Sequence, residues 1–194
     1  MTQLRLPDAD VSYTSHFALP EKPNLLLDHL RKSVPWRQEE VVVWGKRHQQ
    51  PRLVAWYGDP EKSYTYSGVH LDPLPWSDVL VAIRKAVESR SGHKFNSVLL
   101  NLYRDEKDSM GFHSDDEKEL GPTPTIASVS LGQKRTLIFK HKSRAELKPT
   151  RLDLESGSLL IMKGNTQKHW KHGIEKETRP CGPRVNLTFR EIFS

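Results

Sequence analysis

The sequence predicts a mainly β protein with two supporting helices, an α+β fold whose β core occupies the C-terminal half of the chain. Three observations lead to this prediction. Apolar residues recur at helical spacing in the first half, and the period changes to two after residue 95. Short turns rich in Gly, Pro and Asp then separate the apolar runs. Short strands in such an arrangement are typical of an all-β sandwich or barrel.

The elements follow in order along the chain. We expect the N-terminal segment, residues 1–15, to be poorly ordered. Residues 23–34 predict a helix with Pro23 in its first turn, and residues 77–91 predict a second helix that begins at Ser77 and stops before Gly92. Between them, residues 41–44 and 53–56 are interpreted as a hairpin with residues 46–51 at its tip, followed by an aromatic loop at 57–68. Six strands are then expected, at residues 95–103, 126–131, 136–140, 151–154, 158–162 and 184–192.

Length and composition indicate one domain, spanning residues 1–194, that is soluble and intracellular. A chain of 194 residues with 36% hydrophobic residues can bury a full core. It has no run of roughly 18 apolar residues and no apolar signal-peptide core at its start, so we expect no membrane contact and no export. The expected location is the cytoplasm of a bacterium or the nucleus of a eukaryote. The single cysteine, Cys181, excludes an intramolecular disulfide and a Cys-rich zinc site.

The charge pattern permits an anionic partner. The net charge is +6 and the sequence pI about 9.4. Basic residues gather at 140–151 and at 46–52, whereas acidic residues gather at 115–119. Either basic patch alone is interpreted as a solvated face. Their position around a candidate metal site favours a nucleic-acid interpretation.

The last predicted strand carries the strongest signal for a ligand. Alternation places four polar side chains on one face, namely Arg184, Asn186, Thr188 and Arg190, opposite an apolar face. Two buried arginines are costly unless an anion neutralises them, and the arginine fork suits a carboxylate. The alternative is an edge strand with a polar side in solvent. Asn101 and Tyr103 alternate in the same way, so they are candidates to hydrogen-bond the same acid.

Histidine and aspartate residues supply a candidate metal site. His113 and Asp115 lie two residues apart, and His172 completes a set of two imidazoles and one carboxylate, the facial triad of non-haem Fe(II) oxygenases. His169 competes with His172 for the third place, and Asp116 competes with Asp115. A zinc hydrolase could use the same ligands. It would not need a separate dicarboxylate pocket, which makes it the weaker hypothesis.

Three aromatic residues are candidates for contact with a nucleotide. Tyr64 and Tyr66 lie in a turn-rich segment and could stack on an extruded base. Trp44 precedes the basic hairpin tip and could wedge into a duplex. Ordinary core packing is the alternative for each of them.

The chain resembles the AlkB family of Fe(II)- and 2-oxoglutarate-dependent dioxygenases that reverse nucleic-acid alkylation. The resemblance covers roughly residues 35–193, and its matching segments occur in order. They include Tyr57-Gly58-Asp59, Tyr64-Thr65-Tyr66-Ser67-Gly68, Asn101-Leu102-Tyr103, Gly111-Phe112-His113-Ser114-Asp115-Asp116-Glu117, His169-Trp170-Lys171-His172 and Pro183-Arg184-Val185-Asn186-Leu187-Thr188-Phe189-Arg190. So many ordered matches are far more specific than a single triad.

The resemblance implies a double-stranded β-helix, or jelly-roll, core over residues 95–193, with a nucleotide-recognition hairpin and aromatic loop at 40–70. It implies that His113, Asp115 and His172 bind Fe(II), and that Arg184 pairs with the distal carboxylate of 2-oxoglutarate. The remaining implied roles fall into two sets. Asn101, Tyr103, Asn186 and Arg190 complete the 2-oxoglutarate pocket, and Tyr64, Tyr66, Asp116 and Trp44 contact the substrate.

The implied reaction is oxidative demethylation of bases such as 1-methyladenine and 3-methylcytosine in DNA, with O2 as the second co-substrate and formaldehyde as a product. The acids at residues 115–117 lead us to expect a preference for cationic lesions. The resemblance of the Trp44 hairpin to a duplex-invading finger predicts activity on double strands, with single strands also accepted. The alternatives are the same chemistry on RNA or a protein side chain, and a non-catalytic nucleic-acid-binding jelly roll. We expect a monomer.

Overall fold

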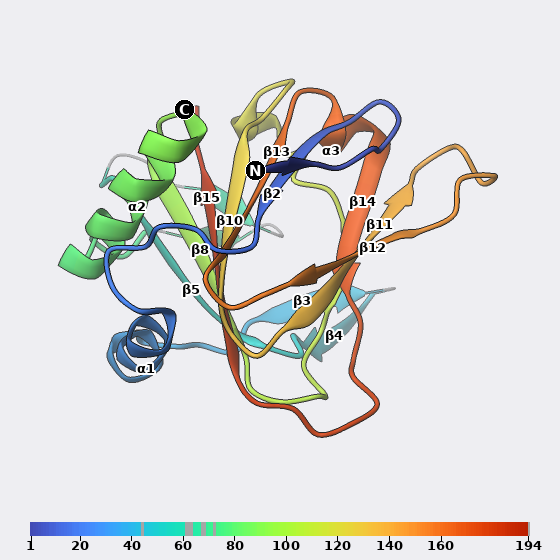
Figure 1. Cartoon of the computed structure of the whole chain (residues 1–194). Coiled ribbons are helices and arrows are strands. Elements are labelled where there is room, and N and C mark those ends of the chain that lie inside the picture. The colour runs from blue at the N-terminus through green and yellow to red at the C-terminus, as the bar shows by residue number, and fades with distance from the viewer. Residues whose placement is uncertain (44, 61–63, 67–68, 72, 194) are drawn as a thin grey trace.

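The computed structural model describes residues 1–43, 45–60, 64–66, 69–71 and 73–193 of the chain. Two antiparallel sheets face each other, with two helices outside the larger one (Figure 1). The larger sheet has the order β1 (Thr2–Gln3), β2 (Asp10–Thr14), β13 (Ser158–Lys163), β10 (Ile126–Gly132), β15 (Arg184–Arg190), β8 (Ser97–Tyr103), β5 (Leu53–Gly58). The smaller sheet has the order β12 (Thr150–Leu154), β11 (Arg135–His141), β14 (Trp170–Ile174), β9 (Met110–His113).

The chain passes between the two sheets in the order of a jelly roll. From β8 to β15 the strands of the larger sheet lie as β13-β10-β15-β8 and those of the smaller sheet as β12-β11-β14-β9. Strands distant in sequence are therefore neighbours, as in the pairing of β10 with β15. The prediction of a mainly β fold with a double-stranded β-helix core is confirmed. The six strands predicted from the alternating pattern are β8, β10, β11, β12, β13 and β15, with ends shifted by a few residues.

The two helices cover the outer face of the larger sheet. α1 (Pro23–Ser33) begins at the predicted proline, and α2 (Asp78–Ser91) ends where Gly92 adopts φ +67°. Their buried side chains pack against the outward residues of β8, β10 and β15 in one hydrophobic cluster. The helix pair thus closes one side of the sheet, and the polar face of β15 is left for the space between the sheets.

The inner faces of the two sheets enclose a second hydrophobic cluster and, beside it, a cavity of about 340 Å³. Leu137, Leu160 and Ile174 form part of the apolar wall. The polar side chains of β8 and β15 project into the same space because strand alternation sends every second residue inward. The cavity is therefore lined by apolar residues on one side and by amide and guanidinium groups on the other.

Residues 40–58 differ from the predicted hairpin. β3 (Glu40–Val43) pairs with β4 (Lys46–Gln49), so the second predicted arm, residues 53–56, is not its partner. Residues 53–58 instead form β5 and pair with β8. The apolar run of β5, with Val54, Ala55 and Tyr57 buried, gains more from an edge of the large sheet than from a short exposed hairpin.

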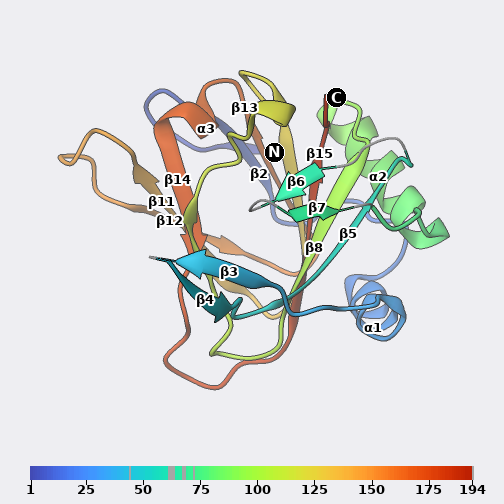
Figure 2. The same cartoon turned by 180° about the vertical axis from the view of Figure 1, so that it is seen from behind.

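The predicted aromatic loop, residues 57–68, contains β6 (Tyr64–Tyr66), which pairs with β7 (Val69–Leu71) just beyond it in a second small hairpin. Tyr57 belongs to β5 and is buried. Figure 2 shows that both small hairpins lie on the same side of the molecule. Trp44 lies outside the described residues, and the side chains of Tyr64 and Tyr66 are outside the described atoms.

The beginning of the chain also differs from the expected flexible segment. β2 pairs with β13 over five residues, and the Val11 side chain is fully buried. The Trp170 indole nitrogen Nε1 donates to the Pro7 carbonyl at 2.8 Å. A single buried valine in a polar segment is a weak sequence signal, which is why the strand is not evident from periodicity alone.

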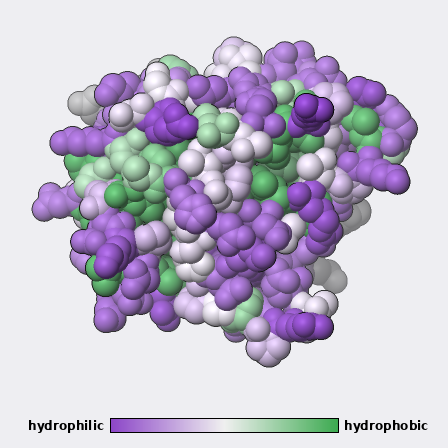
Figure 3. All heavy atoms as spheres, in the orientation of Figure 1, coloured by the Kyte–Doolittle hydropathy of each residue, from purple (hydrophilic) through white to green (hydrophobic). Residues whose placement is uncertain are grey.

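The surface agrees with the charged composition. The face seen in Figure 3 is mostly hydrophilic, and hydrophobic residues gather on it between α1 and α2. None of the helices in the described part of the chain combines the length and apolar character that a membrane span requires.

Candidate active site

Three side chains at the cavity wall converge as metal ligands could. His113 ends β9 and faces His172 of β14 as a cross-strand pair, with ring centroids 4.5 Å apart. Asp115 follows two residues later and places Oδ2 3.5 Å from His172 Nε2. One ligand atom from each residue lies within 4.8 Å of the others. His169 and Asp116, the competing candidates, do not belong to this group.

The protonation states of these groups suit a divalent cation. His113 Nδ1 donates to the Gly111 carbonyl at 3.0 Å, because a carbonyl oxygen can only accept, and this leaves Nε2 with its lone pair. Burial lowers the pKa of His172 to about 3, with the His113 charge adding to the effect and Asp115 opposing it. Burial alone would raise the pKa of Asp115, but the charges of Arg190, His172 and His113 outweigh it and hold this pKa well below its usual range.

The second oxygen of Asp115 indicates that a cation fits here. Asp115 is 1% exposed, and Oδ2 has no hydrogen-bond partner among the described residues. Its other oxygen, Oδ1, accepts from Arg190 Nε at 3.1 Å and from Arg190 Nη2. A buried carboxylate oxygen without a donor costs free energy unless something positive occupies the space before it. The donor set of two imidazoles and one carboxylate is that of a non-haem iron site.

Arg184 indicates an anion site in the same cavity. It is 1% exposed, and Nη2 donates to Ser130 Oγ at 2.9 Å. Its Nε and Nη1 have no hydrogen-bond partner within the described part of the chain. Burial lowers the pKa of Arg184. A guanidinium fork with two unused donors matches a carboxylate in size and geometry.

The other residues expected at the 2-oxoglutarate pocket take different positions. Asn101 and Asn186 line the cavity, where Asn101 Oδ1 accepts from Arg52 Nε at 2.7 Å and Asn186 Nδ2 donates to Ser128 Oγ at 2.7 Å. Tyr103 is fully buried beside Arg184, with the guanidinium carbon 5.0 Å from its ring centroid. Arg190 also lines the cavity, where it forms an ion pair with Asp115.

Sequence reasoning missed three groups that hold this site. Ser130 on β10 supports Arg184, Arg52 supports Asn101, and Gln167 accepts from the Asp115 backbone N–H at 2.9 Å. The alternation of Ser128 and Ser130 within an apolar strand could have revealed the first. Arg52 and Gln167 come from loop and short-helix positions, where alternation gives no signal.

An apolar groove of about 150 Å³ adjoins the cavity. Trp56, Leu74 and Leu120 contribute to its walls. Gln50 and Glu117 line both the groove and the cavity, and each has a buried side-chain oxygen without a partner among the described residues, Gln50 Oε1 and Glu117 Oε2. The groove thus offers apolar walls, and two hydrogen-bond acceptors lie where it borders the cavity that contains the candidate metal ligands.

Asp116 carries an ion pair of its own. Lys142 Nζ lies 2.8 Å from Asp116 Oδ2 and also donates to the Gln167 carbonyl at 2.7 Å. The charge of Asp116 is thereby compensated, as that of Asp115 is by Arg190. Of the three consecutive acids at residues 115–117, Glu117 has no ion pair with another described residue.

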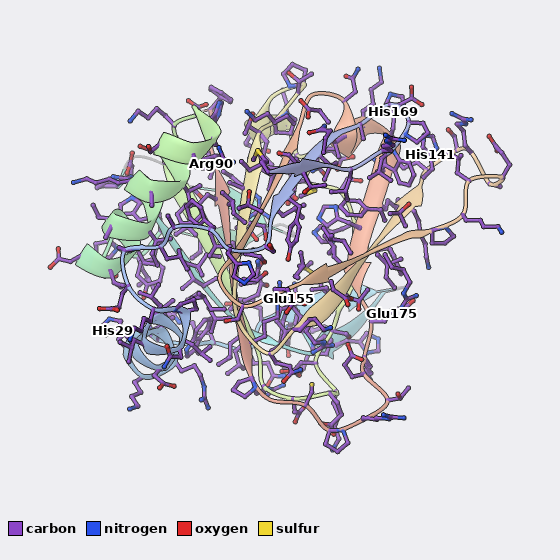
Figure 4. The ribbon with its side chains drawn as sticks, in the orientation of Figure 1. His29, Arg90, His141, Glu155, His169 and Glu175 are labelled. Carbon is purple, nitrogen blue, oxygen red and sulfur yellow. The ribbon has the colours of Figure 1, made fainter. Side chains whose placement is uncertain are left out.

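A second group, Asp8, His141 and His169, has the residue types of a metal site, but the hydrogen bonds of His141 place a proton on the nitrogen that would have to bind the metal. Figure 4 labels the two histidines, which lie near each other at one end of the smaller sheet. His141 Nδ1 accepts from the backbone N–H groups of Ser143 and Arg144, at 3.3 and 3.0 Å. The neutral ring therefore carries its proton on Nε2, which points toward Asp8 Oδ2 at 3.8 Å. A protonated nitrogen cannot bind a metal, and His141 Nε2 has no hydrogen-bond partner among the described residues.

Comparison with known proteins agrees with this geometry. The sequence of residues 10–190 matches the family model of the 2OG-Fe(II) oxygenase superfamily, so the chain belongs to this class of proteins. The chain is 42% identical over 199 residues to DNA oxidative demethylase ALKBH2 of Homo sapiens, covering 98% of this chain and 76% of that protein. The chain belongs to the AlkB family.

Further similarities fall within the same family. Alpha-ketoglutarate-dependent dioxygenase alkB homolog 3 of Homo sapiens is 44% identical over 176 residues, which cover 87% of this chain and 61% of that protein. The chain thus spans about three fifths of the length of this relative. The solved structure of OsALKBH1 aligns with a TM-score of 0.64 at 18% identity over 97% of this chain and 100% of that one, which supports the fold.

The pairing of Arg190 with Asp115 leads to a prediction for the metal-free protein. Replacing Arg190 with Met leaves a buried carboxylate without its cation, so the free energy of unfolding falls by about 3 kcal/mol. Urea denaturation in the presence of a chelator measures it. The double variant Arg190→Met/Asp115→Asn recovers part of the loss because the unpaired charge is gone. A single variant as stable as the parent chain would show that the pair contributes nothing.

Proposed function

We propose that this protein is an Fe(II)- and 2-oxoglutarate-dependent dioxygenase that removes methyl groups from nitrogen atoms of bases in DNA. The observation that carries the proposal is a set of buried groups around one cavity that have no hydrogen-bond partner among the described residues, namely Asp115 Oδ2 and Arg184 Nε and Nη1. Each fits one component of the reaction, a divalent cation or a dicarboxylate. The similarity to the ALKBH2 relatives, which are DNA oxidative demethylases, supports the choice of substrate.

His113, Asp115 and His172 would hold the iron. Bound there with 2-oxoglutarate and O2, Fe(II) supplies the oxidation that converts an N-methyl group to N-hydroxymethyl, with succinate and CO2 as co-products. The hydroxymethyl adduct then loses formaldehyde and leaves the repaired base. All three side chains line the cavity, so a metal held by them would be accessible to substrates that bind there.

Arg184 would bind the distal carboxylate of 2-oxoglutarate through Nε and Nη1. Ser130 fixes the guanidinium orientation through Nη2, so little conformational freedom is lost when the diacid binds. Asn101 and Asn186 contribute polar contacts from neighbouring strands. The apolar wall opposite, which includes Leu137 and Ile174, excludes water from the reacting centre.

The adjoining groove would take the damaged base. Its apolar walls suit a planar ring. Gln50 Oε1 and Glu117 Oε2, which have no hydrogen-bond partner in the described part of the chain, suit the exocyclic amino group of adenine or cytosine. Because Asp115 and Asp116 already have ion-pair partners, the expected preference for cationic lesions would depend mainly on Glu117. This refines the expectation that all three acids contribute.

The substrate-contact roles of Trp44, Tyr64, Tyr66 and Asp116 stay predictions. So do the acceptance of both double and single strands, the monomeric state, the single-domain organisation and the cytoplasmic or nuclear location. RNA is the alternative substrate, since the basic residues at 46–52 and 140–151 suit either nucleic acid. A non-catalytic nucleic-acid-binding jelly roll is the weaker hypothesis, because a binder has no need of a buried carboxylate oxygen and a buried guanidinium that lack hydrogen-bond partners among the described residues.

The proposed activity is tested with a 1-methyladenine oligonucleotide, single- and double-stranded, in the presence of Fe(II) and 2-oxoglutarate. We expect equal release of formaldehyde and succinate, together with loss of the methyl group. His113→Ala should abolish the release of both products because the metal loses a ligand. DNA affinity, measured separately, should be retained by this variant.

Three other outcomes would contradict parts of the proposal. Succinate release without base repair would support the oxygenase site and overturn the substrate. Faster repair of the same lesion in RNA than in DNA would favour the RNA alternative. Full activity of His113→Ala would overturn the assignment of the metal ligands.

The role of Glu117 gives a second prediction. Glu117→Gln keeps the size and one acceptor oxygen but removes the charge, so it should lower kcat/KM for cationic 1-methyladenine by about tenfold, or ~1.4 kcal/mol. Neutral 3-methylthymine should be affected much less, since a neutral base gains little from the carboxylate. Competition between the two lesions in one oligonucleotide measures the change. An equal effect on both lesions would assign Glu117 a role other than charge recognition.

A further inference from the structure

We propose that Gln167 is a positioning residue that fixes the backbone of Asp115 and thereby sets the affinity of the site for its metal. This inference rests on the proposed metal site and concerns a residue that neither touches the metal ligand atoms nor lines the cavity. Gln167 lies in α3 (Thr166–His169), a single helical turn that precedes β14.

The contact is a buried hydrogen bond across the fold. Gln167 Oε1 accepts from the Asp115 backbone N–H at 2.9 Å, and both residues are 1% exposed. The amide orientation is determined, since a backbone N–H can only donate and must face the side-chain oxygen. Gln167 Nε2 then points to Met162 Sδ at 3.5 Å. A sulfur atom is a weak acceptor, so the bond to Asp115 is the main role of this side chain.

Asp115 needs such support because it has no strand to hold it. The pairing of β9 with β14 ends at His113, so the next residues receive no ladder hydrogen bonds. Instead, each is tied to the segment around α3. Ser114 Oγ donates to the Trp170 carbonyl at 3.0 Å, and Lys142 Nζ bridges Asp116 and the Gln167 carbonyl. Gln167 holds the central residue of this loop, the one that carries the carboxylate.

The helical turn that carries Gln167 is itself anchored. Thr166 Oγ1 accepts from the Asp10 backbone N–H at 2.9 Å and donates to the Lys163 carbonyl at 2.6 Å. The N-terminal strand β2, placed beside β13 in Figure 1, therefore fixes α3 against the large sheet. A continuous series of hydrogen bonds runs from Asp10 through α3 to the Asp115 backbone.

The consequence concerns metal affinity. Without an acceptor at position 167, the buried Asp115 N–H would have no hydrogen-bond partner. The free-energy cost of this unsatisfied donor would favour a rotation of the peptide that brings the N–H to another acceptor. Rotation would move the carboxylate relative to His113 and His172, whose positions the sheet fixes. Loss of groups that orient metal ligands lowers metal affinity by about 10- to 100-fold.

The test measures Mn(II) binding to the purified full chain by calorimetry, without 2-oxoglutarate or nucleic acid. Gln167→Met keeps the length and apolar volume of the side chain but removes the acceptor, and we expect Kd for Mn(II) to rise by about tenfold or more. Gln167→Glu retains an acceptor oxygen at the same place and should restore most of the affinity. A Gln167→Met variant with unchanged Kd would overturn the proposal, as would a Gln167→Glu variant as weak as the Met variant.

Three further variants separate the possible causes. Gln133→Met makes the same replacement at an exposed turn and should leave Kd unchanged. Ile83→Val trims a buried side chain of α2 and should lower Tm without changing Kd. If Ile83→Val weakens Mn(II) binding as much as Gln167→Met does, the weaker binding results from a general loss of stability, and the positioning role of Gln167 is overturned. If His113→Ala leaves Kd unchanged, the metal site itself is wrong, which is a different failure.

Discussion

The cavity between the two sheets contains opposite charges that the described protein groups do not neutralise completely, and the rest of the structure is arranged around this constraint. Among the described residues, the buried Arg184 has no hydrogen-bond partner for Nε and Nη1, and the buried Asp115 has none for Oδ2. Both would be strongly destabilising in an ordinary core. They are tolerable if the folded chain normally encloses a cation and an anion that complete them.

The jelly roll provides a rigid frame for this arrangement. Strand β15 is buried on both faces, apolar toward the helices and polar toward the cavity, so it can carry Arg184 without losing its packing. The smaller sheet supplies the two histidines as a cross-strand pair. Only the carboxylate comes from a loop. It is therefore the part of the site that depends most on neighbouring hydrogen bonds, from Arg190 on one side and Gln167 on the other.

The strand pattern predicted a mainly β core, and the family resemblance predicted the jelly roll. The structure brings His113, Asp115 and His172 together and turns the polar side of β15 toward the cavity, as expected, whereas their roles in binding a metal and a dicarboxylate stay predictions. Alternation is reliable for β15 because each of its faces meets a uniform environment. It failed at β2 and β5, where the partners of short strands are set by long-range pairing that a local pattern does not encode. The pairing of Arg190 with Asp115, and the support from Ser130 and Gln167, join residues more than 50 positions apart. Such contacts follow from the assembled sheets, so no sequence spacing reveals them.

The most direct measurement is the affinity for 2-oxoglutarate of the Mn(II)-loaded protein, compared with that of Arg184→Met. We expect the variant to bind 2-oxoglutarate at least about tenfold more weakly, because a charged hydrogen-bonded pair contributes ~1.5–3 kcal/mol. Arg151→Met, the same replacement at an exposed position of β12, should bind as the parent chain does. Equal affinities for the parent chain and Arg184→Met would contradict the claim that the buried guanidinium exists to bind a dicarboxylate.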